Sequence, residues 1–254
     1  MLPLLAAFVS VQGGMYWVGS QDSVQNPRRK VKVAPFEIAV HETTNREFLA
    51  FVTATKYVTV AERKHNAMVF RPPRPEFRWI KDKTASWRFP NGTSMGGIED
   101  KMDHPVTTIS YQDAIAYCKW AKVRLPNIDE WEIACRAGTD GLRFFQAEEP
   151  VSDYANIWLK RDHKTEDFTD GYMYTSPVGS FKPNPWGLYD TYGNVFEFCS
   201  GTLPGEKIPG LAHARGGSWW CSQASCCFFN SVDLGKASLQ ASFSNQGFRV
   251  VRSP

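Results

Sequence analysis

Two long stretches without helical periodicity constrain this chain more than any other feature. Residues 56–103 are rich in proline, glycine, tryptophan and charged side chains, and the run Arg71–Pro75 excludes regular structure at that point. Residues 138–186 contain many turn-forming residues and show no helical repeat. Loops this long in a compact protein usually shape or cover a functional site. The sequence therefore predicts a loop-rich fold whose function depends on its loops.

Regular structure is expected only in short segments between and around these loops. Residues 8–20 have the pattern of two strands joined by a turn at Gly13 and Gly14. Residues 31–40 alternate in the manner of a strand that is interrupted at Pro35, because proline cannot donate to a strand ladder. From Trp186 to the end the chain is aromatic, glycine-rich and strand-like.

Helices are predicted where a capping residue precedes an acidic residue and an apolar face. A capping side chain satisfies the free backbone N–H groups of the first turn, and an acidic residue three positions later can return the bond. Together with the strands, the helices indicate one α+β domain over residues 1–254. The predicted helices cover residues 42–52, 110–121 and 124–136, with N-caps at Thr44, Ser110 and Asn127.

The bulk composition excludes several classes of protein. A net charge of +3 gives no electrostatic case for nucleic acid as a partner. No stretch approaches the roughly 20 apolar residues that a transmembrane helix needs. The apolar segment Met1–Val9 is short and lacks basic residues, so we do not interpret it as a signal peptide. With 43% hydrophobic residues the chain can bury a core without disulfides or metals, and we expect a soluble protein.

The segment Arg215–Cys227 concentrates the residues that are most suited to chemistry. It holds three of the six cysteines, Cys221, Cys226 and Cys227, after a glycine pair and Ser218. Thiols this close together can form a soft-metal site, a redox pair or a nucleophile. The alternative is a buried strand in which the cysteines serve as small apolar residues.

A series of short motifs follows a fixed order along the chain. The motifs are Gly13–Ser20, His41–Phe48, Asp103–Val106, Tyr111–Ala114, Arg124–Pro126, Glu130–Glu132, Tyr154–Trp158, Gly187–Asp190, Gly193–Glu197, Arg215–Trp219 and Gly247–Arg249. Each motif alone is weakly specific, but the ordered combination extends nearly from end to end. In this combination the chain resembles the formylglycine-generating enzyme, or sulfatase-modifying factor, family.

The resemblance implies a compact relative of the C-type lectin fold that is low in regular secondary structure. It also implies structural calcium, for which oxygen ligands on irregular loops are suitable. The alternative for the acidic residues is that they only cap turns. The ligands of one calcium ion would match Asn156, Ile157, Asp170 and Tyr172, and those of a second would match Asp190, Gly193, Val195 and Glu197.

The same resemblance implies an oxidase. Active family members use oxygen and a Cu(I) ion held by two cysteines to convert the cysteine of a Cys-x-Pro-x-Arg peptide in sulfatases to formylglycine. Cys221 and Cys226 match the two copper ligands, and Ser218 matches the active-site serine. Two thiolates suit the soft Cu(I) ion, which tolerates low coordination and leaves room for a substrate thiolate.

The chain also departs from the pattern of active members. Ser222 stands where a histidine is usual, and Ser225 stands where an aromatic residue is usual. Phe196 and Phe198 replace the two tryptophans around Glu197. These departures leave open a non-catalytic member that uses its C-terminal surface to bind a ligand or protein, or a module of a longer signalling protein.

The partner cysteines of secretory members are replaced by Ser231 and Val250. We therefore expect Cys118 and Cys135 to be free core thiols, and we expect a cytoplasmic rather than a secreted protein. The expected partner is a peptide or protein, acting as substrate or ligand, and the expected oligomeric state is a monomer.

Overall fold

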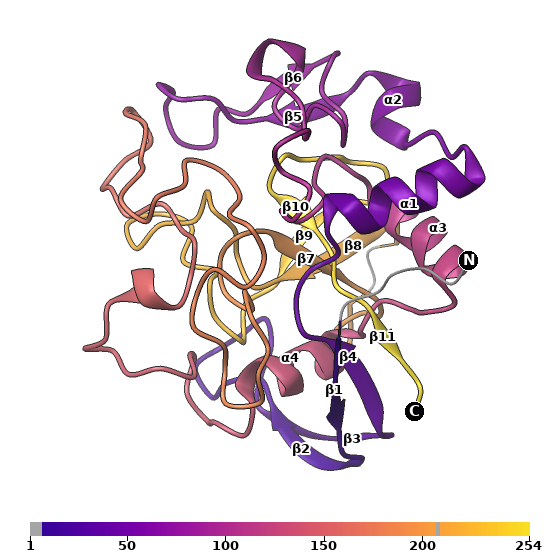
Figure 1. The fold of residues 1–254 in the computed structure, drawn as a ribbon. Coiled ribbons are helices and arrows are strands. Elements are labelled where there is room, and N and C mark those ends of the chain that lie inside the picture. The colour runs from indigo at the N-terminus through magenta and orange to yellow at the C-terminus, as the bar shows by residue number, and fades with distance from the viewer. Residues whose placement is uncertain (1–6, 207–208) are drawn as a thin grey trace.

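A small sheet at the centre of the molecule is assembled from the last quarter of the chain (Figure 1). The computed structural model describes residues 7–206 and 209–254. The second strand of the sheet, β7, is buried along its whole length, and its Glu197 lies opposite Arg215 of the next strand. Across the sheet the strands are β10 (Gln246–Gly247), β7 (Phe196–Cys199), β8 (Leu211–Arg215) and β9 (Gly235–Ser238).

A second sheet joins the two ends of the described chain. Its middle strand pairs antiparallel with a strand near the N-terminus and with one near the C-terminus. A separate hairpin precedes the middle strand, and Pro35 separates the two, so the predicted interruption at Pro35 is confirmed. The strands are β1 (Phe8–Val11), β4 (Phe36–Ala39) and β11 (Val251–Arg252) in the sheet, and β2 (Gly14–Val18) and β3 (Arg29–Val33) in the hairpin.

The three predicted helices form where the capping boxes were expected. In each, the N-cap side chain accepts a backbone N–H and the acidic residue at the third position returns the bond. No helix within the described ranges is long and apolar enough to cross a membrane. The helices are α1 (Asn45–Thr55), α3 (Tyr111–Ala121) and α4 (Ile128–Arg136), with N-caps Thr44, Ser110 and Asn127.

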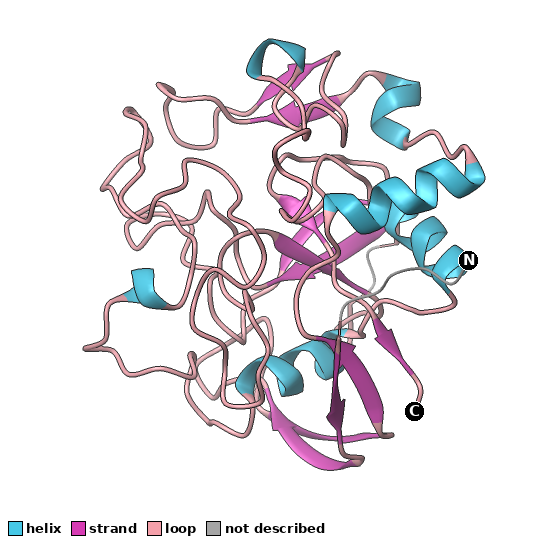
Figure 2. Ribbon diagram, in the orientation of Figure 1, coloured by secondary structure: helices cyan, strands magenta, loops and turns pink. Residues whose placement is uncertain are grey.

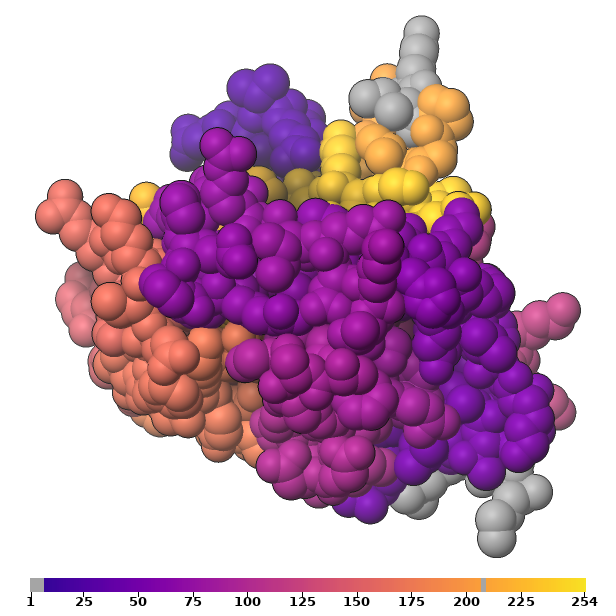
Figure 3. Space-filling model, turned by 90° about the horizontal axis from the view of Figure 1, so that it is seen from above, coloured from indigo at the N-terminus to yellow at the C-terminus, as the bar shows by residue number. Residues whose placement is uncertain are grey.

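The stretch 56–103 is more regular than we predicted. It contains the short helix α2 (Val60–Lys64) and a hairpin of β5 (Ala67–Val69) and β6 (Ile80–Asp82). The signal missed for α2 is a capping box in which Thr59 accepts from the backbone of Glu62. Figure 3 shows this purple to magenta part of the chain spread over one face of the molecule. A single-turn 3-10 helix, η1 (Thr93–Met95), follows.

Loops occupy most of the remaining volume, as predicted, and fill one side of the view in Figure 2. Within residues 138–186 the regular element is the single-turn 3-10 helix η2 (Val151–Asp153). An aromatic core holds these loops on the helices: the ring centroids of Phe48 and Trp87 are 5.2 Å apart, as are those of Tyr117 and Phe248. Burying each such side chain contributes roughly 1.5–3 kcal/mol. The prediction of a loop-rich α+β domain is confirmed.

Candidate metal and substrate site

The loop that carries the cysteines, residues 216–229, is closed at its base by a buried arginine. Arg215 Nη1 donates to the carbonyl of Ser231 at 2.8 Å, which ties the two ends of the loop together. Arg215 Nη2 donates to Glu132 Oε2 at 3.0 Å, and both side chains are fully buried. The cysteine loop therefore has a fixed base on α4.

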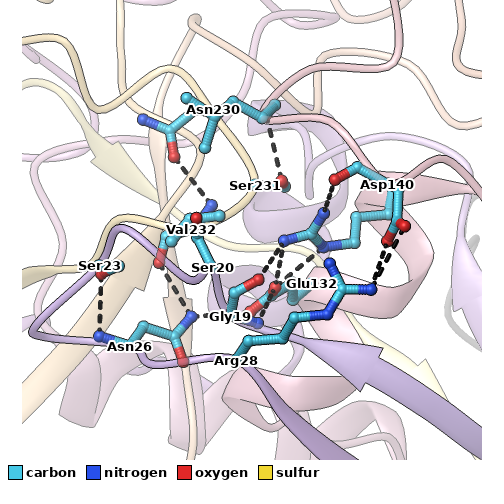
Figure 4. Close-up of polar contacts among 12 residues, drawn as sticks. Gly19, Ser20, Ser23, Asn26, Arg28, Glu132, Asp140, Asn230, Ser231 and Val232 are labelled. Atoms are coloured by element: carbon cyan, nitrogen blue, oxygen red, sulfur yellow. Dashed lines mark hydrogen bonds and ion pairs between the residues drawn. The ribbon is translucent and has the colours of Figure 1, made fainter.

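Glu132 is the centre of a larger buried network, drawn in Figure 4. Its carboxylate accepts from the backbone N–H of Gly19 at 2.6 Å and from Asn26 Nδ2 at 2.9 Å. Asn26 Nδ2 also donates to the carbonyl of Val232 at 3.1 Å. Arg136, one turn along α4, donates from Nε to Oε1 of the same carboxylate at 2.9 Å. The network connects the N-terminal hairpin, α4 and the end of the cysteine loop.

Cys221 and Cys226 are brought together as predicted. Their Cα atoms are 4.5 Å apart, and their Sγ atoms form a disulfide in the structure. Cys221 is completely buried, whereas Cys226 is partly accessible. Cys227 is exposed and lies outside the pair, with its Sγ near the carbonyls of Ser222 and Gln223. Neither bonded sulfur can act as a thiolate, so metal binding requires reduction of the disulfide first.

Cys118 and Cys135 are free and buried, which confirms the expectation of unpaired core thiols. Burial raises the pKa of both thiols to about 12. A thiol with so high a pKa is neutral and unreactive at neutral pH. Cys199 is also free and buried, and burial raises the pKa of its thiol, so the reactive cysteines are those of the loop 216–229.

Ser218 lies beside the cysteine pair, also as predicted. Its Oγ is 4.0 Å from Cys221 Sγ and accepts from Asn245 Nδ2 at 2.9 Å. Ser218 is completely buried, and Asn245 is almost so. No motif or spacing singles out Asn245, because it comes from a separate segment before β10. Asn245 fixes the position of the serine hydroxyl behind the sulfur atoms.

Cys226 lines a cavity of about 330 Å³, and six of the fourteen residues that line it are aromatic. Trp220 contacts Trp79 and Phe77, with ring centroids 5.7 Å and 4.9 Å away. Asn245 lines the same cavity and so connects it to Ser218. The aromatic lining residues are Phe77, Trp79, Phe196, Trp220, Phe228 and Phe243. A sulfur atom, a positioned hydroxyl and an apolar cavity thus adjoin one another.

The first predicted calcium set contains a carboxylate whose bonding is incomplete. Asp170 Oδ1 accepts from the backbone N–H of Tyr172 at 3.0 Å, whereas Oδ2 is buried and has no partner. Burial is the main cause that raises the pKa of Asp170 to about 6. Asn156 is buried and donates from Nδ2 to the carbonyl of Tyr174 at 2.8 Å. The unpaired oxygen and the neighbouring carbonyls of this set fit a hard cation.

The second predicted set fits less completely. Asp190 is buried and accepts from Gly179 N at 2.6 Å through Oδ2, and its Oδ1 is unpaired. Burial raises its pKa to about 6. Glu197, in contrast, is already bound to Arg249 at 2.6 Å and to Trp131 Nε1 at 2.7 Å. Glu197 therefore serves a buried ion pair whether or not it also contacts a cation.

The two predicted calcium sets meet at the contact between Asn156 and Gly193. Asn194 N donates to the carbonyl of Asn156 at 2.8 Å, and Gly193 sits so close that a Cβ there would come within 2.2 Å of the same oxygen. Gly193 has a φ of 75°, which favours glycine. The buried Val195 follows on the same turn.

Glu42 belongs to this acidic region, although our sequence analysis placed it only at the start of a helix. It accepts from Asn194 Nδ2 at 3.0 Å through one oxygen and has no partner for the other. Burial, and then the charges of Asp190 and Glu197, raise its pKa well above the usual range. No group of three or more His, Cys, Asp or Glu side chains converges as a metal site within residues 7–206 and 209–254.

The family model for the sulfatase-modifying factor enzyme 1-like domain matches residues 3–254. The chain belongs to this family, and the expected resemblance is confirmed. The formylglycine-generating enzyme of Thermomonospora curvata is 33% identical over 97% of this chain and 93% of its own length.

Relatives and solved structures define what this membership covers. The protein named inactive C-alpha-formylglycine-generating enzyme 2 from Mus musculus is 35% identical over 84% of this chain and 74% of its own length. Similarity of this degree therefore includes both active and inactive proteins. The structure of PvdO from Pseudomonas aeruginosa superimposes with a TM-score of 0.70 at 25% identity, covering 98% of this chain and 95% of that one.

Proposed function

We propose that this protein is a copper-dependent oxidase that converts a peptide cysteine, as in the Cys-x-Pro-x-Arg segment of sulfatases, to formylglycine. The observation that carries the proposal is the placement of Cys226, which is paired with Cys221 and also lines the cavity. A pair of soft ligands with one member accessible from a cavity is suitable for a metal that must also accept a substrate sulfur.

The roles of the protein's own residues follow from their positions. Cys221 and Cys226 would hold the ion after reduction, and the ion would supply electrons for oxygen and a soft site for the substrate thiolate. The aromatic walls place apolar surface beside the reacting sulfur. Ser218, held by Asn245, places its hydroxyl beside the pair and can orient a polar group of the substrate.

The reaction balance requires an external reductant. Conversion of the substrate CH₂SH group to CHO by O₂, with release of hydrogen sulfide and water, consumes two protons and two electrons. We assign these electrons to an added thiol, which is oxidised to its disulfide and which also reduces the Cys221–Cys226 bond. The proposal therefore requires thiol-containing conditions.

Copper binding is the first prediction of this proposal. The reduced protein is expected to bind Cu(I) stoichiometrically, and Cys221→Ser and Cys226→Ser are each expected to abolish tight binding. Cys227→Ser is the matched control, since this neighbouring thiol is exposed and lies outside the pair. Competition with a chromogenic Cu(I) chelator measures the affinity. Equal binding by wild type and by a Cys221→Ser, Cys226→Ser double variant would overturn the assignment.

A second candidate function is ligand binding without oxidation. The aromatic cavity favours it, because an apolar cavity with few polar groups is typical of a binding site. The replacements Ser222 and Ser225 in the loop, together with an inactive relative, are also compatible with it. Absence of Cu(I) binding, combined with peptide binding in the cavity, would select this function over the first.

We also propose structural calcium at the two loop sets, with Asp170 and Asp190 as the main carboxylate ligands. The support is the unpaired buried oxygen on each. Carbonyls of Ile157, Tyr172, Gly193 and Val195, together with Asn156 and Glu197, would complete the ligands. Burial makes an unpaired carboxylate costly, and a bound cation removes much of this cost.

Removal of calcium is therefore expected to lower the thermal stability. Dialysis against a chelator should reduce the Tm by several degrees, and added Ca²⁺ should restore it. Asp170→Asn should weaken the response, because the amide removes the negative charge at nearly the same size. Asp22→Asn is a matched control on an exposed turn outside both sets. An unchanged Tm in chelator would show that the ligand assignment is wrong.

A further inference from the structure

The cavity beside Cys226 is lined by aromatic rings. Six aromatic side chains from four separate segments face it, and they pack mainly edge to face or tilted. Trp79 and Phe243 have ring centroids 5.4 Å apart at 80°, and Phe196 and Phe228 have centroids 6.2 Å apart at 90°. Aromatic pairs prefer edge-to-face contacts, and an additional ring in the cavity can make further contacts of this kind.

The charge of the cavity does not suit an arginine. No aspartate or glutamate is among its lining residues within the described parts of the chain. The charged residue that lines it is Lys236, whose Nζ is paired with Glu206 Oε1 at 2.5 Å. A guanidinium group placed here would lose water without gaining a carboxylate, and burial of an unpaired charge is strongly unfavourable.

We propose that the cavity selects a peptide in which an aromatic residue adjoins the reacting cysteine. This inference rests on the proposed function, because it takes the sulfur of Cys226 to mark the reacting centre. The aromatic side chain enters the cavity while the neighbouring cysteine lies at the Cys221–Cys226 pair. The volume of about 330 Å³ is at the lower end of typical ligand cavities and suits one ring with its flanking backbone.

Phe77 and Trp79 form one wall of this cavity. Both belong to the segment between β5 and β6, and Phe77 is 66% exposed. The neighbouring Glu76 is held by His163 Nδ1 at 3.3 Å, and His163 Nε2 contacts the carbonyl of Trp220 at 2.8 Å. His163 thereby links this wall to Trp220, which also lines the cavity.

The test measures binding rather than oxidation, so that it does not depend on copper. Fluorescent peptides with serine in place of the reacting cysteine carry phenylalanine, alanine or arginine at the preceding or the following position. Their affinity for the reduced, metal-free full chain is measured by anisotropy. The phenylalanine peptides are expected to bind about tenfold more tightly than the alanine peptides. The arginine peptides are expected to bind most weakly.

Variants locate the binding in this cavity. Phe228→Ala removes a wall, and Ala241→Trp fills the space; each is expected to remove most of the phenylalanine preference. Phe168→Ala is the matched control, because Phe168 is 58% exposed and does not line this cavity. Thermal unfolding verifies that each variant is folded. The comparison of the three kinds of peptide on the wild-type protein tests the inference even if a variant does not fold.

Equal affinity for the phenylalanine, alanine and arginine peptides would overturn the inference, as would a preference that survives both cavity variants in folded protein. Failure of Cu(I) binding with the aromatic preference intact would instead overturn only the oxidase proposal. The two results are therefore distinguishable.

Discussion

Replacing Glu132 with glutamine is expected to lower the free energy of unfolding by about 3–5 kcal/mol. The carboxylate is fully buried and faces the guanidinium groups of Arg136 and Arg215, which are also buried. Glutamine keeps the size but removes the charge. Both oxygens of Glu132 accept from N–H donors, so the amide NH₂ of glutamine would face donors in place of one of these oxygens. Two buried cations then lose their compensation, which costs more than an exposed ion pair ever contributes.

Urea unfolding followed by tryptophan fluorescence and far-UV circular dichroism measures this effect. The matched control is Asp140→Asn, which breaks the exposed pair with Arg28 at 3.3 Å, shown in the same close-up (Figure 4). We expect that control to change stability by less than about 1 kcal/mol. A Glu132→Gln variant as stable as the control would contradict the role of this network as the base of the cysteine loop.

The helices could be predicted because their start signals are local. Thr44, Ser110 and Asn127 each bond to residues within one turn, so no distant part of the chain is needed to recognise them. The same signal at Thr59 was overlooked because the surrounding stretch is dominated by loop composition. The interruption at Pro35 was likewise visible, since it depends on the chemistry of proline alone.

The cavity could not be predicted, because its walls come from distant segments. Trp79 follows the first helices in sequence, Phe196 lies in β7, and Phe243 precedes β10. The sequence contains no periodicity that would bring these three side chains together. The proximity of Cys221 and Cys226 was easier to predict, because their separation of five residues and a family motif both indicate it.

The buried acidic region shows the same limit. Asp190 and Glu197 were selected from two neighbouring motifs, whereas Glu42 is more than a hundred residues earlier and is bonded to Asn194 in the same region. Arg249, from another motif, claims both oxygens of Glu197. Sequence motifs thus indicated which residues gather here, but not which of them already compensate one another.

Cys226→Ser is expected to abolish oxidation while leaving the fold intact. The side chain is only partly buried and lines the cavity, so serine replaces sulfur with little change in packing. A hydroxyl is a poor ligand for Cu(I), so the pair of thiolates that would hold the ion is lost. Cys227→Ser serves as the control for handling and oxidation, because that exposed thiol lies outside the pair.

Mass spectrometry of a cysteine peptide incubated with reduced, Cu(I)-loaded protein, oxygen and thiol is the most direct test of the proposed oxidase function. Peptides with the Cys-x-Pro-x-Arg sequence and with phenylalanine beside the cysteine are both included. We expect oxygen-dependent replacement of the CH₂SH group by CHO with wild type and with Cys227→Ser, and no product with Cys226→Ser. Absence of product from copper-loaded, folded wild type with every peptide, or equal product with Cys226→Ser, would contradict it.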